Sequence, residues 1–292
     1  MTFKRVRKAV IPVAGFGTRV LPGTKVIPKE LLNVVDRPIL SYIVAEARDA
    51  GIEHFVFVTG RQKGAIEDYF DHQFELEAQL EAKGKTALLD QLLAELPKSG
   101  EMSFVRQMQP LGLGHAVNCA RDIIGDEPFA VLLPDMVMDA ETPALSQAIS
   151  AYEKVGGNII LVEEVPADET HKYGVVAVEP SDDPLRRMTG MVEKPAKGTA
   201  PSNLIVSGRY ILQPDIFPLL SQQVPGAGGE IQLTDSMVSL MKTQSFFALR
   251  YDGETYDCGD KIGLLKANVA LALKRPDLDK AARAALSPYF DR

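Results

Sequence analysis

Short β-rich runs alternate with helical stretches through the first half of the chain, and this alternation limits the fold more than any other sequence feature. The predicted strands are residues 9–13, 55–59, 103–107 and 129–134, and the predicted helical stretches are 39–50, 74–96 and 115–123. This pattern is typical of βαβ units, and it predicts an α/β fold with a doubly wound, mixed but mostly parallel sheet covered by helices on both faces. Ligands of such sheets bind beyond the carboxyl ends of the strands.

The alternation of helices and strands continues to about residue 178 and then loosens. Thr142 followed by Pro143 predicts the start of a helix that runs to about Lys154, and further strands are predicted at 159–162 and 175–178. Turn-rich segments then separate the later strands, and residues 261–286 have a helical pattern with a break at Pro276. We therefore expect three parts: residues 1–136, residues 137–260 and C-terminal helices at 261–292 that pack on the core or on another subunit.

Composition excludes several classes of protein. The 292 residues are 46% hydrophobic and 24% charged, as in globular proteins, and the net charge of −7 argues against nonspecific nucleic-acid binding. No apolar stretch is long enough to span a membrane, and Pro12 and Gly15 interrupt the run that follows the basic N-terminus. Cys119 and Cys258 lack disulfide or zinc spacing, and the histidines form no metal motif, so a reduced, cytoplasmic protein is expected.

A glycine-rich loop with several cations follows the first predicted strand. Ala14, Gly15 and Gly17 allow the backbone N–H groups to approach a ligand closely. The cations that follow within this loop are Arg19, Lys25 and Lys29. Because the chain as a whole is acidic, this local cluster is the best candidate for a polyphosphate site. The alternative is an ordinary glycine turn with solvated charges.

Two common phosphate loops fit the sequence poorly. Gly15 and Gly17 match the start of a dinucleotide-binding fingerprint, but Val20 stands where its third glycine belongs. The run Gly84-Lys85-Thr86 matches the end of a P-loop, yet it lies within a helical, acidic stretch and does not follow a strand. We interpret this second run as an interruption of a surface helix.

Five motifs resemble those of the sugar-nucleotide pyrophosphorylases, and the resemblance as a whole extends from residue 12 to about residue 263. These pyrophosphorylases are nucleotidyltransferases that join a sugar 1-phosphate to a nucleoside triphosphate. The motifs are Gly15-Phe16-Gly17-Thr18-Arg19 with Leu21-Pro22, Pro28-Lys29-Glu30, Gly112-Leu113-Gly114-His115-Ala116, Val192-Glu193-Lys194-Pro195 and Gly229-Glu230-Ile231-Gln232-Leu233-Thr234-Asp235. One departure is Gly23, where the family more often has alanine, and it removes no binding group.

The resemblance implies a Rossmann-like nucleotidyltransferase fold with a nucleotide-binding half at 1–136 and a smaller sugar-phosphate-binding portion at 137–260. Within the family, the motifs are most similar to bacterial members that convert UTP and glucose 1-phosphate into UDP-glucose and pyrophosphate, and a homo-oligomer is expected. Two alternatives remain open at this stage. One is a related pyrophosphorylase with another base or sugar, and the other is a sensor that binds sugar nucleotides without turnover.

The resemblance also assigns roles to individual residues. Arg19, Lys29 and Lys194 would be the catalytic cations. The residues expected to hold the nucleotide are Ala14, Gly15, Gly17, Lys25, Glu30, Gln107 and Gly112. The residues expected to hold the sugar phosphate are Gly174, Glu193 and Lys194. Outside this context, Glu193 and Lys194 would be read as a surface ion pair.

Two aspartates are candidates for binding Mg²⁺. Asp135 follows the apolar strand at 129–134, where a carboxylate can hold a cation over the sheet, and Asp257 would supply the second carboxylate. Either residue alone would more often be a turn or cap residue. His115 and Cys258 lie beside the motifs but have no partner at a catalytic spacing, so we expect packing or hydrogen-bonding roles for them.

Overall fold

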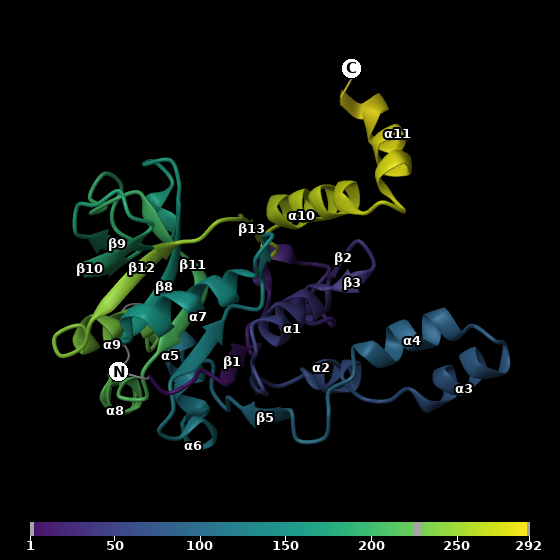
Figure 1. Cartoon of the computed structure of the whole chain (residues 1–292), viewed down its shortest axis with the longest axis horizontal. Helices are drawn as coiled ribbons and strands as arrows, with labels where there is room; N and C mark the ends of the chain where they lie inside the picture. Colours follow the sequence, from purple (N-terminus) through teal and green to yellow (C-terminus); the bar gives the residue numbers. More distant parts are fainter. Residues whose placement is uncertain (1–2, 225–228, 291–292) are drawn as a thin grey trace.

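A nine-stranded sheet forms the centre of the protein in the computed structural model, which describes residues 3–224 and 229–290 (Figure 1). The strand order is β5-β4-β1-β6-β11-β8-β12-β10-β9. The strands are β1 (Lys8–Pro12), β4 (His54–Thr59), β5 (Met102–Arg106), β6 (Phe129–Leu132), β8 (Asn158–Glu164), β9 (Gly174–Val178), β10 (Leu185–Glu193), β11 (Leu204–Leu212) and β12 (Phe246–Arg250). Strands β1, β4, β5 and β6 are those that the alternating pattern predicted in the first half, with bounds shifted by one or two residues.

The sheet is parallel only in part. Strands β5, β4, β1 and β6 run parallel to one another. Beyond β6, however, β11 lies antiparallel to both β6 and β8, and β10 lies antiparallel to both β9 and β12. The prediction of a mostly parallel sheet is therefore wrong for the second half. For β9 and β10 the physical reason is their short, turn-rich connection, because strands joined in this way pair antiparallel. The direction of β11 is set by pairings with β6 and β8, which are distant from it in sequence.

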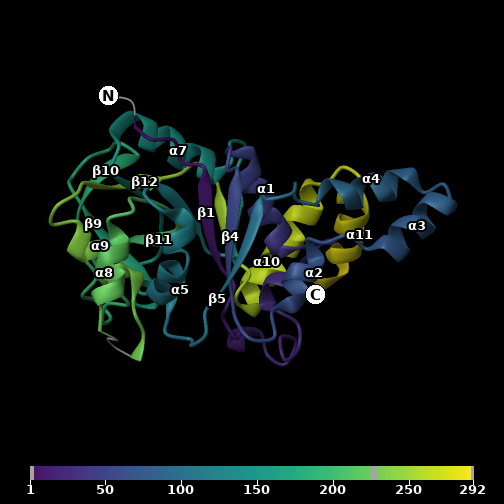
Figure 2. The same cartoon turned by 90° about the horizontal axis from the view of Figure 1, so that it is seen from below.

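Helices cover both faces of the sheet (Figure 2). Residues of α1 (Ile39–Asp49), α7 (Ala144–Val155) and α10 (Lys261–Lys274) pack on one face. Residues of α5 (Leu113–Cys119), α6 (Arg121–Ile124), α8 (Ile216–Gln222) and α9 (Leu233–Leu240) pack on the other. Along β1 the side chains alternate, with Ala9 and Ile11 in the first core cluster and Val10 in the second.

The predicted helices outside the core differ in detail. The stretch at 74–96 is two helices, α3 (Phe74–Ala82) and α4 (Thr86–Ala94), so residues 84–86 do interrupt a surface helix. Neither helix buries a residue, and both project from the body together with α11 (Asp279–Phe290) (Figures 1 and 2). Helix α7 begins one residue later than predicted, because Pro143 is its N-cap. Among the described helices, none is both long and apolar enough to cross a membrane.

Small elements that the sequence did not predict shape the carboxyl edge of the sheet. Strand β7 (Met136–Asp139) pairs antiparallel with β13 (Glu254–Asp257), and Met136 lies opposite Asp257. The remaining short elements are β2 (Asn33–Val34), β3 (Arg37–Pro38), α2 (Gly64–Tyr69) and the 3-10 turns η1 (Thr18–Val20), η2 (Lys29–Leu31) and η3 (Thr170–Lys172). The pairing of β7 with β13 brings two segments about 120 residues apart in sequence to the end of β6.

A buried ion pair joins α1 to the middle of the sheet. The Arg209 side chain on β11 is fully buried, and its Nη2 lies 2.6 Å from Oε2 of Glu46. Glu46 also accepts a hydrogen bond from the backbone N–H of Leu145 at the start of α7. Removing one partner of a buried pair leaves an uncompensated charge, and this costs more than removing both.

We expect Arg209→Met to lower the free energy of unfolding by about 3–5 kcal/mol, because it strands the Glu46 carboxylate in the core. The double variant Glu46→Gln/Arg209→Met removes both charges and should be more stable than the single variant. Urea unfolding followed by circular dichroism measures both. A double variant less stable than Arg209→Met would contradict this account of the pair.

Candidate functional site

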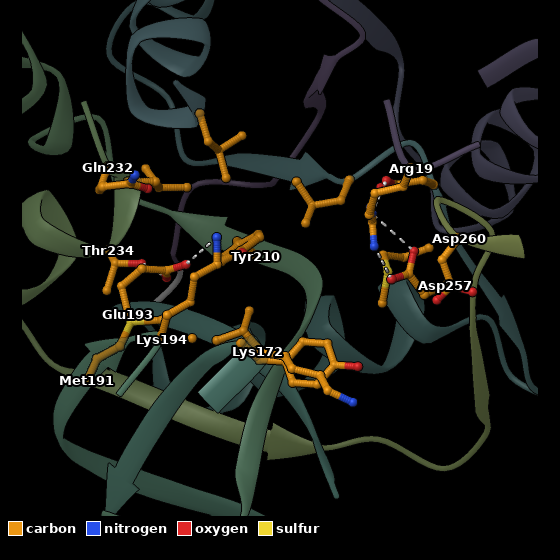
Figure 3. Close-up of a pocket in the computed structure, with 18 residues that line it drawn as sticks. Arg19, Lys172, Met191, Glu193, Lys194, Tyr210, Gln232, Thr234, Asp257 and Asp260 are labelled. Atoms are coloured by element: carbon orange, nitrogen blue, oxygen red, sulfur yellow. Dashed lines mark hydrogen bonds and ion pairs between the residues drawn. The ribbon is translucent and has the colours of Figure 1, made fainter. Parts of the chain in front are cut away.

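Two adjoining cavities open at the carboxyl ends of the parallel strands. We call the first the glycine-loop cavity: it has a volume of about 500 Å³, and its walls include Ala14, Gly15 and Gln107. The second, the β10 cavity, has a volume of about 670 Å³ and is shown in Figure 3. Both are lined by Leu113, Leu133 and Asp135. The loops after β1, β5 and β6 all contribute to these walls, as the fold class predicted.

Asp135 lies where the two cavities meet and is held by two cations. Its Oδ2 is 2.5 Å from Nζ of Lys29 and 3.3 Å from Nη2 of Arg19. Burial opposes ionisation of this carboxyl group, but the charges of Lys29 and Arg19 outweigh burial and hold the pKa of Asp135 below its usual value. The aspartate is therefore a buried, fully ionised carboxylate at the border between the cavities.

Arg19 connects Asp135 to Asp257. Its Nη1 lies 2.8 Å from Oδ2 of Asp257, and its Nη2 contacts the second oxygen at 3.5 Å (Figure 3). Burial disfavours the Arg19 cation, but the hydrogen bond and charge of Asp257 outweigh it and raise the pKa of the guanidinium. A Cβ atom at Gly259 would lie 2.3 Å from Nη2 of Arg19 and 2.5 Å from Oδ2 of Asp135. Glycine at this position thus lets the three charged groups converge.

The glycine-loop cavity contains a fixed amide side chain. Both N–H bonds of the Gln107 amide are used inside the protein, since Nε2 donates to the carbonyl oxygen of Gly112 at 3.1 Å and to Nδ1 of His115 at 2.9 Å. Burial lowers the pKa of His115, which favours the neutral ring that this contact needs. His115 thus has the hydrogen-bonding role expected of it. The Gln107 amide oxygen is the group that this side chain offers to a ligand.

The β10 cavity places a glutamate and a lysine opposite the Arg19 cluster (Figure 3). Glu193 at the end of β10 accepts a hydrogen bond from the Thr234 hydroxyl at 2.9 Å. A Cβ atom at Gly174 would lie 3.0 Å from the same carboxylate oxygen, so a larger residue would crowd it. Lys194 is mostly exposed, with its Nζ 4.0 Å from Glu193. The cavity therefore has the Glu193 carboxylate and the exposed Lys194 ammonium at one end and the Arg19 guanidinium at the other.

Three predicted nucleotide residues line neither cavity. Lys25 is exposed on the loop. Gly17 has a positive φ of 65° and lies against Lys29, so its contribution is to let the loop fold back. Glu30 is completely buried, with its Oε2 2.8 Å from Nζ of Lys63, which places its carboxylate in the core and away from a ligand. The structure thus does not bring these three side chains to the cavities.

Several lining residues were missed by the sequence reasoning. Tyr173 and Lys172 line the β10 cavity beside Gly174, and Asp260 does so beside Asp257. Glu230 and Thr234 belong to a motif that the sequence did single out, but without a role. Their position in the motif was the available signal. What the sequence lacked was the contact between this motif and Gly114, whose N–H donates to the carbonyl oxygen of Ile231 at 2.9 Å.

Comparisons with known proteins agree with this geometry. The family model described as nucleotidyl transferase matches residues 8–273. The UTP-glucose-1-phosphate uridylyltransferase of Bacillus subtilis (strain 168) is 49% identical over 288 residues, which cover 99% of this chain and 97% of that protein. A solved UDP-glucose pyrophosphorylase from Acinetobacter baumannii has a TM-score of 0.90 at 44% identity, covering 97% of this chain and 99% of its own. A UTP-bound UGPase from the same organism has a TM-score of 0.89 at 44% identity, covering 96% and 98%.

The buried pair of Glu30 and Lys63 predicts a pH-dependent stability. Burial raises the pKa of Glu30, and the charge of Lys63 partly offsets this. Lys63→Met removes the offset, so the folded state holds the Glu30 proton up to a higher pH than the unfolded state does. Stability is retained below the ordinary glutamate range near pH 4.3 and is lost as the pH rises through the raised pKa.

We therefore expect Lys63→Met to lower the free energy of unfolding by about 3–5 kcal/mol at pH 8 and by clearly less at pH 5. Urea unfolding at both pH values measures the difference. Lys25→Met, which removes an exposed cation from the same loop region, should change stability by about 0.5 kcal/mol or less. A loss that is equal at the two pH values would show that Glu30 does not carry this charge.

Proposed function

The chain belongs to the nucleotidyl transferase family, and from this premise we propose that it makes UDP-glucose and pyrophosphate from UTP and glucose 1-phosphate. The observation that carries the proposal is the pair of cavities that share Asp135. One cavity contains the Gln107 amide, which can bind a base, and the other contains the Glu193 carboxylate, which can bind sugar hydroxyls. The names of the relative from Bacillus subtilis and of the UTP-bound structure support the same substrates.

The glycine-loop cavity suits a uracil base. We infer that the Gln107 amide oxygen accepts a hydrogen bond from N3–H of uracil, because the amide N–H groups are already used by Gly112 and His115. Cytosine has no N3–H, so the same oxygen would face an acceptor. The backbone at Ala14, Gly15 and Gly112 then lies beside the base. We propose on this basis that a Rossmann-like half at 1–136 holds the nucleotide and that residues 137–260 hold the sugar phosphate.

The β10 cavity suits a sugar 1-phosphate. Glu193 can accept hydrogen bonds from sugar hydroxyls, and Thr234 already fixes one of its oxygens. The flexible ammonium of Lys194 reaches from the rim of the same cavity and can meet the phosphate. The backbone beside Gly174 contributes to the sugar wall. A phosphate held here would face the α-phosphate of a nucleotide across Asp135.

The residues present fit a divalent cation. Asp135 and Asp257 share the single nitrogen Nη2 of Arg19, so two carboxyl groups converge on one point. No group of three or more potential metal ligands occurs within residues 3–224 and 229–290, so substrate oxygens and water would complete the shell. We propose that these two carboxylates hold Mg²⁺, which when bound withdraws charge from the phosphate oxygens and helps to orient them.

The remaining chemistry requires positioning and charge. We propose in-line attack of a sugar-phosphate oxygen on the α-phosphorus of UTP, with pyrophosphate as the leaving group and no covalent enzyme intermediate. Lys29 and Arg19 sit at the border of the cavities, where they neutralise the charge that develops on the pyrophosphate. Lys194 holds the attacking phosphate in place. The chain thus acts chiefly by bringing two anions together.

The projecting helices fit a subunit contact. Helices α3 and α4 bury no residue within the chain, and α10 exposes Ile262 and Leu265 (Figure 1). We propose that the chain assembles into a homo-oligomer through such surfaces.

The proposal is tested by the purified protein with four nucleoside triphosphates and several sugar 1-phosphates in Mg²⁺, with pyrophosphate release as the readout. We expect UTP with glucose 1-phosphate to be used best and EDTA to abolish turnover. Fastest turnover with another base or sugar would identify a related pyrophosphorylase instead. Tight binding of UDP-glucose without pyrophosphate release from any pair would identify a sensor.

Lys194 and Glu193 should fail differently when changed. Lys194→Ala removes a charged contact to phosphate, so we expect the Michaelis constant for glucose 1-phosphate to rise about 10- to 100-fold. Glu193→Gln keeps the shape but not the charge, so it should weaken discrimination between sugars. Titrations of one substrate with the other saturating measure both variants. If both variants lose UTP affinity and keep their sugar-phosphate constants, the sugar site has been placed wrongly.

A further inference from the structure

Arg209 uses its whole guanidinium inside the protein, although it lines neither cavity. Nε and Nη2 donate to the Glu46 carboxylate. Nη2 also donates to the carbonyl oxygen of Met136 at 2.8 Å, and Nη1 donates to those of Leu133 at 3.3 Å and Gly208 at 3.2 Å. All five N–H bonds therefore have acceptors, which is an arrangement that only arginine can make.

Two of those acceptors flank Asp135. The carbonyl group of Leu133 lies in the short loop between β6 and β7 that carries the aspartate, and that of Met136 belongs to the first residue of β7. The same loop is held from two other directions. The N–H of Leu133 donates to the carbonyl oxygen of Gly208 at 2.9 Å, and the N–H of Cys258 donates to that of Asp135 at 2.8 Å. The backbone on both sides of Asp135 is thus fixed by Arg209, which is itself held by its ion pair with Glu46.

We propose that Arg209 is a positioning residue for Asp135, and that Glu46 fixes Arg209 for this purpose. The proposal rests on the proposed function, in which the Asp135 carboxylate must meet Lys29, Arg19 and the substrates at one point. A catalytic group that moves by about 1 Å can lose about 100-fold in rate. Arg209 therefore acts through the backbone of residues 133–136 and touches neither substrate.

Two carbonyl contacts and a bidentate carboxylate contact need a planar fork. A lysine ammonium at position 209 can still neutralise Glu46, but it is a single point with three donors and cannot serve both Leu133 and Met136 in the same way. Arg209→Lys therefore separates the stability of the buried pair from the positioning of the loop.

The chain offers a matched control at Arg48, on the same helix as Glu46. Arg48 pairs with Glu101 at 3.0 Å and also donates to the carbonyl oxygens of Glu95 and Leu96, both at 3.4 Å. Arg48, like Arg209, thus combines an ion pair with backbone carbonyl contacts, two in place of three, and it lines neither cavity. Arg48→Lys makes the same chemical change away from Asp135.

The experiment compares Arg209→Lys, Arg48→Lys and the wild-type chain in two measurements. In UDP-glucose synthesis, we expect Arg209→Lys to lower kcat about 10- to 100-fold while both Michaelis constants stay within about threefold. In Mn²⁺ titrations with UTP present, followed by electron paramagnetic resonance, its Mn²⁺ dissociation constant should rise about 10-fold. Arg48→Lys should match the wild type in both measurements.

Wild-type kcat and Mn²⁺ affinity in Arg209→Lys would overturn the proposal, and so would equal losses in Arg48→Lys. If Arg209→Lys does not fold, the double variant Glu46→Gln/Arg209→Met is used in its place. It removes the N–H groups that donate to the backbone carbonyl oxygens and leaves no buried charge, so the same kinetic losses are expected of it. A wild-type chain that makes no UDP-glucose would refute the proposed function, and the Mn²⁺ measurement would then decide the role of Arg209 by itself.

Discussion

The ionised carboxylate of Asp135 is the constraint around which the site is built. A charge in so buried a place must be compensated, and Lys29 and Arg19 supply the compensation from the loop after β1. Arg19 extends the cluster to Asp257, which β13 brings alongside. Three segments far apart in the sequence are thus tied together by opposite charges at the end of β6. The same groups that satisfy one another here are those with the charge to hold phosphates.

Hydrogen bonds to the backbone around Asp135 hold this charged cluster in place. The backbone of residues 133–136 is fixed by the guanidinium of Arg209 and by the N–H of Cys258. The position of Asp135 therefore depends on contacts that no substrate touches. On the open side, glycine at 259 leaves room for the charged groups to converge. Gly174 does the same for Glu193 in the neighbouring cavity. The charged side chains of this site can therefore approach one another closely because glycines beside them have no Cβ atom.

The sequence predicted those parts of the fold that depend on local periodicity. The strands of the first half, helix α1, the break near Gly84 and the break at Pro276 all follow from patterns within a few residues. The direction of the later strands did not follow, because β11 inserts between β6 and β8 through pairings that are distant in sequence. Helix α7 was displaced by one residue, since Pro143 caps the helix and does not begin its first turn.

For the site, the amino-acid sequence by itself determined which chemical groups are available and which loops carry them: cations after β1, Asp135 after β6, and Glu193 with Lys194 at the end of β10. Only the tertiary structure decided how they are used. Glu30 and Lys25 have the same residue chemistry as binding groups, but Glu30 is buried against Lys63 and Lys25 stays at the surface. Arg209 carried no local signal, because the groups that accept its hydrogen bonds come from three separate segments: Glu46, residues 133–136 and Gly208. Ion pairs and carbonyl contacts of this kind depend on distances across the fold, and residue order alone does not specify those distances.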